Sequence, residues 1–418
     1  MRARRDSIAT KASPGSPMAR ILVLVENLSV PFDRRVWQEC QTLREAGHDV
    51  VVVCPCGSEQ DRERRVRLED VDIHRYPLRS ATGGAFGYLS EYPVALWHSL
   101  RLTLRVQRRG RVDVVHICNP PDLFFLCALP LKLAGARVVF DQHDLVPELF
   151  LSRFGGSNRI LYRLCLLLER VTYRVANHVL ATNESYRAIA LRRGGLRADE
   201  VTVVRSAPDL SRFKLVDPDA ELRRGKRYLL CYVGVMGPQD GVDYALRAIA
   251  HLRHELGRSD FHAAFVGGGD VFENAVRLAH DLGLDGVVEF TGRISDEALA
   301  RYLSTADICL APDPKNPLND ISSMNKIVEY MAMSRPIVAF DLTEGRISAG
   351  DAALYARPND THDFAAAIAT LLDDPERRAS MAAYGSARVA NELSWKNSAA
   401  NLLTAYDRVL EANLQATM

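Results

Sequence analysis

The sequence predicts an α/β protein made of two doubly wound domains, each with a parallel sheet covered by helices. Short apolar runs alternate with loops and amphipathic helical patterns, which is typical of parallel α/β folds. The alternation restarts at Tyr228, after a charged stretch that contains proline. A length of 418 residues also allows two domains that each bury a core.

Composition narrows the class of protein. With 47% hydrophobic and 25% charged residues and a net charge of +1, the chain is an ordinary globular protein without the general basicity of nucleic-acid binders. Its eight cysteines lie mostly in apolar runs and lack C-x-x-C spacing, which predicts reduced thiols of a cytoplasmic protein and no metal site. No apolar run is long enough to span a bilayer.

The predicted organisation has five parts. These are a disordered leader (1–17), a first Rossmann-like domain (18–205), a linker (206–227), a second Rossmann-like domain (228–393) and a terminal segment (394–418). The leader is basic and rich in Ser, Ala and Pro, and it lacks the apolar centre of a secretory signal.

The first half shows the apolar runs of buried parallel strands. They are Arg20–Val25, His48–Cys54, Val71–Tyr76, Val112–Cys118, Val138–Asp141, His178–Ala181 and Val201–Val204, and helical patterns cover Phe32–Ala46, Leu89–Arg109 and Asn158–Ala176.

The first turn, from Glu26 to Arg35, contains no glycine, which argues against a dinucleotide-binding fingerprint. Arg34 and Arg35 place two cations at a helix start, either to contact a phosphate or to lie solvated at the surface.

Polar residues follow the strands of this half. Asn119 follows one strand, His143, Asp144 and Glu148 follow the next, and Asn183 follows the last. Because open parallel sheets bind ligands beyond the carboxyl ends of their strands, these residues are candidates for a site. The two later helices interleave arginines with leucines, so each either leans on an anionic membrane or packs on the sheet with its arginines in water.

The second half repeats the pattern. Strands are predicted at Tyr228–Val233, His262–Val266, Val287–Phe290, Ile308–Ala311 and Ile337–Phe340, and the intervening helices include one at Val242–Leu256 and one capped by Ser295. Glycine-bearing loops follow the first strands, with Gly234 and Val235 in one and Gly267 and Gly292 in the others.

A helix from about Met324 to Met333, with Ser322 or Ser323 as its N-cap, is the main candidate for chemistry. Its first N–H groups can hold a phosphate, Lys326 adds a positive charge, and Glu329 can accept hydrogen bonds from a ribose diol. The alternative is an ordinary amphipathic helix with a solvated i,i+3 ion pair.

Residues Glu329, Met331, Ala332 and Pro336 resemble the donor-binding helix of retaining glycosyltransferases of family 4. His143 and Asp144 also match a His-Asp pair on a loop of that family. The resemblance implies the GT-B fold, in which two Rossmann-like domains face a central cleft and the last helix crosses back to the first domain. Ile321 stands where the family has an earlier glutamate, and the nearest acid is Asp320.

The sequence also departs from the family in the loop after Val233. Val235 and Asp240 occupy the positions of an arginine and a lysine that neutralise the donor diphosphate. Lys326, Arg205 and the N–H groups of Ser323 and Met324 are expected to replace them, because charge growing on a leaving group needs fixed cations or dipoles. The sequence shows no metal-ligand cluster and no Asp-x-Asp motif of the kind that a metal-assisted phosphate site would use, so neither a metal ion nor any other cofactor is expected.

The resemblance implies transfer of a sugar, with retention, from a UDP- or GDP-linked donor to a hydroxyl of a saccharide or lipid-linked acceptor. The catalytic candidates are His143, Lys326 and Glu329. The donor-side candidates are Arg205, Gly234, Val235, Gly267, Gly292, Arg293, Asp320, Ser322, Ser323, Met324 and Asn325, and the acceptor-side candidates are Arg34, Arg35, Asn119, Asp144, Glu148 and Asn183.

The product is expected to enter a polysaccharide, glycolipid or other glycoconjugate. No nucleic-acid partner is expected, and the location is cytoplasmic with peripheral contact to the inner membrane face. Two alternatives remain open, a nucleotide-sugar 2-epimerase of the same architecture and a catalytically weak nucleotide-sugar-binding subunit.

Overall fold

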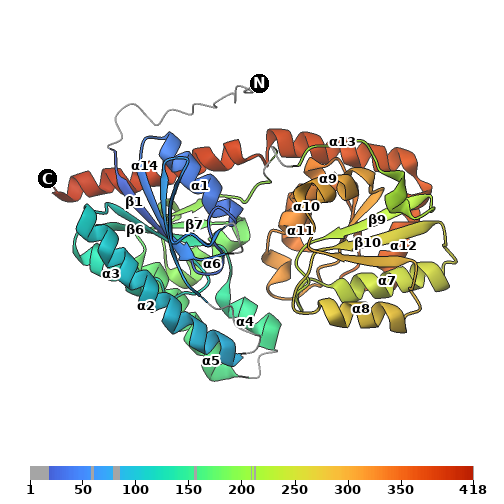
Figure 1. Ribbon diagram of the computed structural model, residues 1–418, viewed down its shortest axis with the longest axis horizontal. Helices are drawn as coiled ribbons and strands as arrows, with labels where there is room; N and C mark the ends of the chain where they lie inside the picture. Colours follow the sequence, from blue (N-terminus) through green and yellow to red (C-terminus); the bar gives the residue numbers. More distant parts are fainter. Residues whose placement is uncertain are drawn as a thin grey trace. The chain divides into compact units, whose positions relative to one another are not determined.

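The computed structural model describes residues 18–57, 61–78, 85–154, 158–208, 210 and 213–417. The leader over 1–17 therefore lies outside the described residues. The chain forms two compact units (Figure 1). The first contains Met1–Leu151, Gly156–Ser206 and Trp395–Met418, and the second contains Ser152–Gly155 and Ala207–Ser394. The predicted cleft between the domains stays a prediction.

The first unit is built on an eight-stranded sheet of order β3-β4-β2-β1-β5-β6-β7-β8. The strands are β1 (Arg20–Leu24), β2 (Asp49–Pro55), β3 (Arg65–Leu68), β4 (Val71–Tyr76), β5 (Val114–Cys118), β6 (Arg137–Gln142), β7 (His178–Ala181) and β8 (Val201–Val203). All neighbours pair in parallel except β3, which runs antiparallel to β4 at the edge. The sequence did not predict β3, because its alternating charged and apolar residues leave no continuous apolar run.

Seven helices of the described chain belong to this unit. They are α1 (Arg34–Glu45), α2 (Ala85–Arg109), α3 (Phe125–Leu133), α4 (Val146–Phe154), α5 (Arg159–Val175), α6 (Glu184–Gly194) and α14 (Trp395–Thr417). The C-terminal α14 packs Leu402, Tyr406 and Leu410 into the core of this unit (Figure 1). Trp395 Nε1 also donates a hydrogen bond to Thr42 Oγ1 of α1 at 2.9 Å.

The second unit has a six-stranded parallel sheet of order β11-β10-β9-β12-β13-β14. Its strands are β9 (Tyr228–Val233), β10 (Phe261–Val266), β11 (Val288–Gly292), β12 (Ile308–Ala311), β13 (Ile337–Phe340) and β14 (Ala353–Ala356). Its helices are α7 (Val242–His254), α8 (Phe272–Asp281), α9 (Asp296–Thr305), α10 (Asn325–Ala332), α11 (Thr343–Ala349), α12 (Thr361–Asp373) and α13 (Pro375–Asn391). The predicted Ser295 N-cap of α9 is confirmed, since its side chain accepts from the Ala298 N–H.

The fold places polar loops at one edge of each sheet. Parallel strands end at the same edge, so the loops after β1, β5 and β6 lie together in the first unit, as do those after β9, β10 and β12 in the second. The cysteines form no disulfides, as predicted, and six of the eight are buried. Within the described part of the chain, no helix combines the length and apolar character that a membrane crossing requires.

Candidate functional site

Asn119, directly after β5, organises the loop that carries His143. Its Oδ1 accepts hydrogen bonds from the N–H groups of His143 at 2.7 Å and Asp144 at 3.2 Å. Its Nδ2 donates to the Asp144 carbonyl at 2.7 Å and to Asp122 Oδ1 at 2.9 Å. The amide is buried and engaged on both sides. Asn119 therefore fixes the conformation of the loop that carries His143. The prediction was instead that Asn119 contacts the acceptor.

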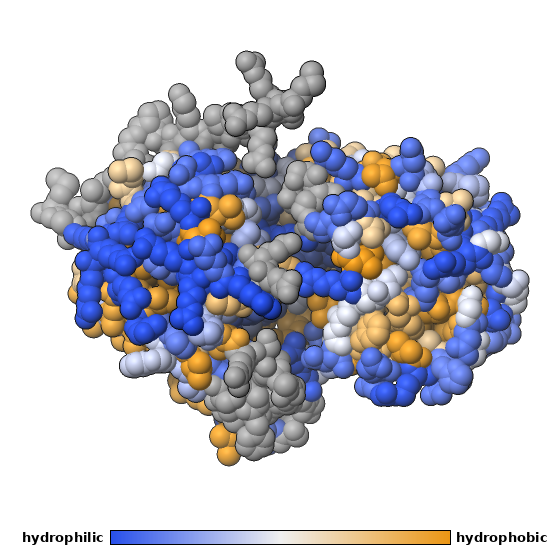
Figure 2. Space-filling view, viewed as in Figure 1, coloured by the Kyte–Doolittle hydropathy of each residue, from blue (hydrophilic) through white to orange (hydrophobic). Residues whose placement is uncertain are grey.

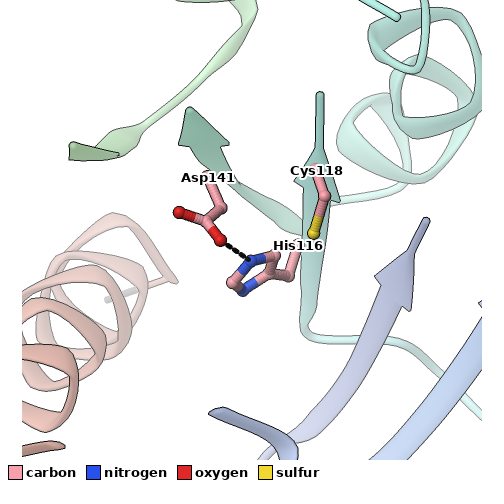
Figure 3. Close-up of side chains that lie close together, drawn as sticks. All are labelled: His116, Cys118 and Asp141. Carbon is pink, nitrogen blue, oxygen red and sulfur yellow. Dashed lines mark ion pairs between the residues drawn. The ribbon is translucent and has the colours of Figure 1, made fainter. Parts of the chain in front are cut away.

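Asp141, the penultimate residue of β6, is the centre of a buried charged cluster. Arg35 grips it with two hydrogen bonds, Nε to Oδ2 at 3.0 Å and Nη2 to Oδ1 at 2.6 Å. His143 Nε2 lies 2.5 Å from Oδ2 of the same carboxylate. His116, from the adjacent β5, points its imidazole toward this carboxylate at 3.7 Å (Figure 3). The side-chain partner of His143 in this cluster is therefore Asp141.

The cluster fixes the protonation of its members. Burial lowers the pKa of His143, but the Asp141 carboxylate more than offsets this effect and raises that pKa to about 9. Burial conversely raises the pKa of Asp141, but Arg35 and His143 outweigh it and hold the pKa well below its usual range. At neutral pH the loop therefore carries an imidazolium. Such a group can stabilise negative charge but cannot begin as a general base.

A second layer of side chains surrounds Arg35. Its Nη2 lies 3.2 Å from Glu39 Oε1, and its Nη1 donates to the Val204 carbonyl at 2.7 Å. The guanidinium is only 8% exposed, so Arg35 serves neither of the two roles considered for it, surface solvation or phosphate contact. Arg34 is exposed. On the far side of His116, the Tyr406 hydroxyl from α14 lies 2.8 Å from Nδ1.

Two further acceptor-side candidates have structural partners. Glu148 accepts two hydrogen bonds from Arg193, at 2.7 and 3.0 Å, and the same guanidinium binds Glu169 at 2.8 Å. Asn183 is buried and caps α6, its Oδ1 accepting from the Tyr186 N–H at 2.8 Å. Neither side chain has the freedom that an acceptor contact requires.

In the second unit, three candidate glycines come together. The Gly267 N–H donates to the Gly292 carbonyl at 3.0 Å, and the Gly234 N–H donates to the Val266 carbonyl at 3.1 Å. Gly292 ends β11 instead of lying in a loop. Gly267 has a φ of +129°, and a Cβ there would lie 1.9 Å from the Gly234 carbonyl oxygen. Only glycine allows these loops to approach so closely. Beside them, Val235 and Arg293 are exposed.

Replacing Gly267 with Ala is expected to destabilise the second unit by roughly 1–3 kcal/mol, because the strained φ and the backbone clash act together. Gly268→Ala is the matched control, since its Cβ would meet no atom within 4 Å and its φ lies outside the region that disfavours L side chains. Urea denaturation of both variants checks this difference. Equal midpoints would show that the loops do not need glycine at residue 267.

The start of α10 differs from the prediction. The helix begins at Asn325 with Met324 as its N-cap, and no side chain caps it. The predicted caps Ser322 and Ser323 lie too early, because a 3₁₀ turn at Asn319–Ile321 precedes them. Ser322 Oγ instead donates to the Leu318 carbonyl at 2.8 Å. Asn325, at the first helical position, is exposed.

Lys326 does lie close to the glycine loops, but it is a buried ion-pair partner. Its Nζ donates to Asp313 Oδ1 at 2.7 Å, lies 3.8 Å from Asp240 Oδ1 and sits 5.0 Å above the Tyr232 ring. Only 8% of Lys326 is exposed. Burial lowers its pKa, yet Asp313, Tyr232 and Asp240 more than offset this and raise the pKa above its usual value. Two carboxylates thus face one ammonium group.

Asp313 is the site residue that sequence reasoning missed. It lies two residues after the end of β12, at the edge where open parallel sheets bind ligands, and this position was the signal that could have identified it. Asp320, in contrast, accepts from the Thr343 N–H at 2.9 Å and lies 3.2 Å from Lys315 Nζ. Asp320 therefore fixes the start of α11. This carboxylate, the nearest to the position of the first family glutamate, already has partners within the protein.

The predicted donor-binding roles of Glu329 and Arg205 stay predictions. Glu329 is half-buried on α10, one turn after Lys326. Arg205 is half-buried in the first unit, where its carbonyl accepts from Ser398 Oγ at 2.8 Å. Lys326 belongs to the other unit, so the predicted joint action of Arg205 and Lys326 stays a prediction.

Two groups of potential metal ligands occur among the described residues, and the sequence revealed neither because each is completed by a residue from a second element. The first is His116, Cys118 and Asp141. Asp141 there already binds Arg35, and burial raises the thiol pKa of Cys118 well above its ordinary value, so these residues do not suit a metal. The second is the surface group His251, Glu255 and His362, in which the two imidazoles stack with centroids 3.6 Å apart.

Comparison with known proteins identifies the family. The family "Glycosyl transferase 4-like domain" matches residues 33–207, and "Glycosyl transferases group 1" matches residues 227–374. The chain is 30% identical over 365 residues to D-inositol 3-phosphate glycosyltransferase of Thermobispora bispora, covering 82% of each chain. It is 27% identical over 391 residues to phosphatidyl-myo-inositol mannosyltransferase of Mycolicibacterium smegmatis, covering 91% of this chain and 90% of that one.

Solved structures agree on the fold. Sucrose-phosphate synthase from Thermosynechococcus elongatus superposes with a TM-score of 0.76 at 19% identity, covering 94% of this chain and all of the other. Anabaena HepE, crystallised with UDP and glucose, superposes with a TM-score of 0.69 at 14% identity, covering 93% of this chain and 100% of the other. At these identities the likeness establishes the fold alone.

The two parallel α/β units and these matches define a glycosyltransferase of the GT-B fold, an enzyme that moves a sugar from a nucleotide-sugar donor. The chain belongs to glycosyltransferase family 4. The predicted fold class and enzyme class are therefore confirmed. The findings give no support to the alternative of a nucleotide-sugar epimerase.

Proposed function

We propose that this enzyme is a retaining glycosyltransferase that binds the nucleoside diphosphate of its donor in the second unit. The observation that carries the proposal is the position of Lys326, a fixed cation among glycine loops that let a ligand approach the backbone. The N–H groups at the start of α10 add a positive dipole beside it. Glu329, one turn further along α10, would accept the ribose hydroxyls.

In the proposed reaction, the bond between the anomeric carbon and the diphosphate oxygen breaks, and a bond to the acceptor oxygen forms on the same face of the sugar. The acceptor hydroxyl proton leaves with the diphosphate or passes to solvent. Negative charge grows on the leaving oxygen, and Lys326 with the α10 N–H groups would stabilise it. The His143 imidazolium, held by Asp141, would donate a hydrogen bond to a hydroxyl of the reacting sugar and so orient it.

The relatives suggest a chemical class for the acceptor. Two are named for transfer to an inositol phosphate or to phosphatidylinositol. We therefore propose a polyhydroxylated acceptor, with the exposed Arg34 at the start of α1 as a cationic contact. The donor would be UDP- or GDP-linked, and HepE supports the first choice because it was crystallised with UDP.

A peripheral membrane contact would involve α5. Ile160, Leu164 and Leu167 are exposed at i, i+4 and i+7, which places three apolar side chains on one helix face. Arg163 and Arg170 are exposed on the same helix. Such a helix can lie in the interface of an anionic bilayer, with its apolar face among the acyl chains.

The test is a thermal-shift screen of UDP, GDP and their sugars, followed by analysis of the product with a panel of polyol acceptors. Ligands that bind only the folded state raise the melting temperature, and a concentration of 100 Kd corresponds to about 2.7 kcal/mol. We expect one nucleotide to dominate, one α-linked product from an α-linked donor, and an unchanged rate with EDTA. An inverted product or loss of the rate with EDTA would contradict the proposal.

A further inference from the structure

A cavity of about 180 Å³ in the first unit is lined by six arginines and by no acidic side chain. Arg64 and Arg65 come from the start of β3, Arg75 from β4, and Arg101, Arg105 and Arg109 from α2. The α2 residues recur every four positions and therefore share one face of the helix. We call this cavity the arginine pocket. Hydrophilic side chains gather widely on the face of this unit that Figure 2 shows.

The arginines of the pocket are poorly neutralised by the protein itself. Among the described residues, only Arg75 has an acidic partner, Asp61 at 2.8 Å. The other five are exposed, and the described part of the chain gives them no ion pair. Like charges at i and i+4 on a helix repel each other and destabilise it. Because this cluster of arginines is unfavourable for folding, a role in binding an anion is the better explanation for it.

The positive charge of the arginine pocket affects His74 and Arg75, which line it. Burial lowers the pKa of His74, and the nearby Arg65, Arg109 and Arg105 lower it further, whereas Asp72 acts in the opposite direction. Arg75 is 5% exposed, and its Nε has no hydrogen-bond partner among the described residues. A buried donor without a partner is costly, so a ligand oxygen that reached it would be bound favourably.

We propose that the arginine pocket binds a phosphate ester or diphosphate group. Guanidinium groups present paired donors that match phosphate oxygens, and several of them around one cavity favour a group with at least two negative charges. The volume is about six times the roughly 30 Å³ share of a water molecule, which leaves room for such a group. Tyr76 and Leu102 in the wall provide an apolar side. The pocket is separate from the donor site, which belongs to the second unit.

The first experiment titrates the full chain with inorganic pyrophosphate and follows the His74 ring by NMR. A bound polyanion is expected to raise the pKa of His74, because it offsets the field of Arg65, Arg105 and Arg109. The variant Arg101→Gln/Arg105→Gln should weaken pyrophosphate binding about tenfold or more at this site. Raising the salt should also weaken it, since exposed charges are screened.

The matched control is Arg108→Gln/Arg192→Gln, which removes two positive charges from exposed residues outside the pocket, one of them on α2. It should change the affinity less than twofold. A His74 pKa that does not respond to pyrophosphate, or equal losses in both double variants, would overturn the proposal. Thermal denaturation of both variants identifies any loss of folding.

A second arm distinguishes a free phosphate from a lipid headgroup. Phosphatidylcholine vesicles with and without phosphatidic acid are sedimented with the same proteins. If the pocket variant loses binding to phosphatidic acid vesicles and the control does not, the ligand is a lipid headgroup. If it loses only pyrophosphate binding, the ligand is a soluble phosphate. Unchanged binding in both arms contradicts the proposal.

Discussion

Replacing Asp141 with Asn is expected to remove most of the turnover and to destabilise the first unit by about 3–5 kcal/mol, the usual effect of breaking one side of a buried ion pair. Asp141 is fully buried, and its carboxylate is the shared partner of Arg35 and His143. An amide of the same size retains one acceptor oxygen, but it leaves His143 without its counter-charge and Arg35 with Glu39 alone. Urea denaturation and an initial-rate assay measure the two losses.

The matched control is Asp49→Asn, which removes an exposed carboxylate 3.2 Å from Arg20 Nε in the same unit. Exposed pairs contribute about 0–1 kcal/mol, so this variant should keep nearly normal stability and full turnover. If Asp141→Asn proved as mild as the control, the buried cluster could not be the support of His143.

The same cluster gives the stability a definite pH dependence. The folded pKa of His143 is raised to about 9, so its contribution is complete below the unfolded value of about 6.5 and is lost as the pH rises through 9. Burial raises the pKa of Glu39 to about 8, so the protonated Glu39 also contributes stability that is lost as the pH rises. The free energy of unfolding should therefore fall between pH 6.5 and 9. In His143→Gln this fall should be smaller, and an unchanged slope would contradict the assignment.

The sequence was most informative where parallel strands are buried on both faces. The apolar run Val71–Tyr76 predicted β4 to the residue, and Ile337–Phe340 predicted β13. Some elements were missed, among them the edge strand β3, the short β14 and the helix α11. The strand β3 has no continuous apolar run, and α11 mixes charged residues with a glycine.

The site was predictable only in part, for reasons of geometry. His143 was identified from its place after a strand, but no carboxylate partner was predicted for its side chain. Residues i and i+2 of an extended chain share a face, so Asp141 was the better choice. Arg35 contacts Asp141, which lies 106 positions further along the chain, and Tyr406 contacts His116, which lies 290 positions earlier. No local sequence pattern indicates such contacts.

The second large effect is expected at Lys326. Replacing it with Met leaves Asp313 and Asp240 facing each other without a cation, so we expect a loss of about 3–5 kcal/mol in stability together with the loss of turnover. The single variant cannot separate folding from chemistry. The double variant Lys326→Met/Asp313→Asn removes one unpaired carboxylate and should recover part of the stability without recovering turnover. Recovery of both would show that Lys326 acts only in folding.

Asp240→Asn provides the complementary test, because it changes the charge around Lys326 without removing the ammonium group. Two unit charges about 4 Å apart interact by about 4 kcal/mol at an effective dielectric constant of 20, so a carboxylate at 3.8 Å strongly offsets the Lys326 field. Its Oδ2 accepts from the Gly237 N–H at 2.9 Å, and the Asn oxygen can keep this bond. If Lys326 binds the donor diphosphate, this variant should lower the donor KM several-fold. Asp243→Asn, half-exposed on α7, should leave KM unchanged, and equal KM values in the two variants would mean that the ammonium group does not contact the donor.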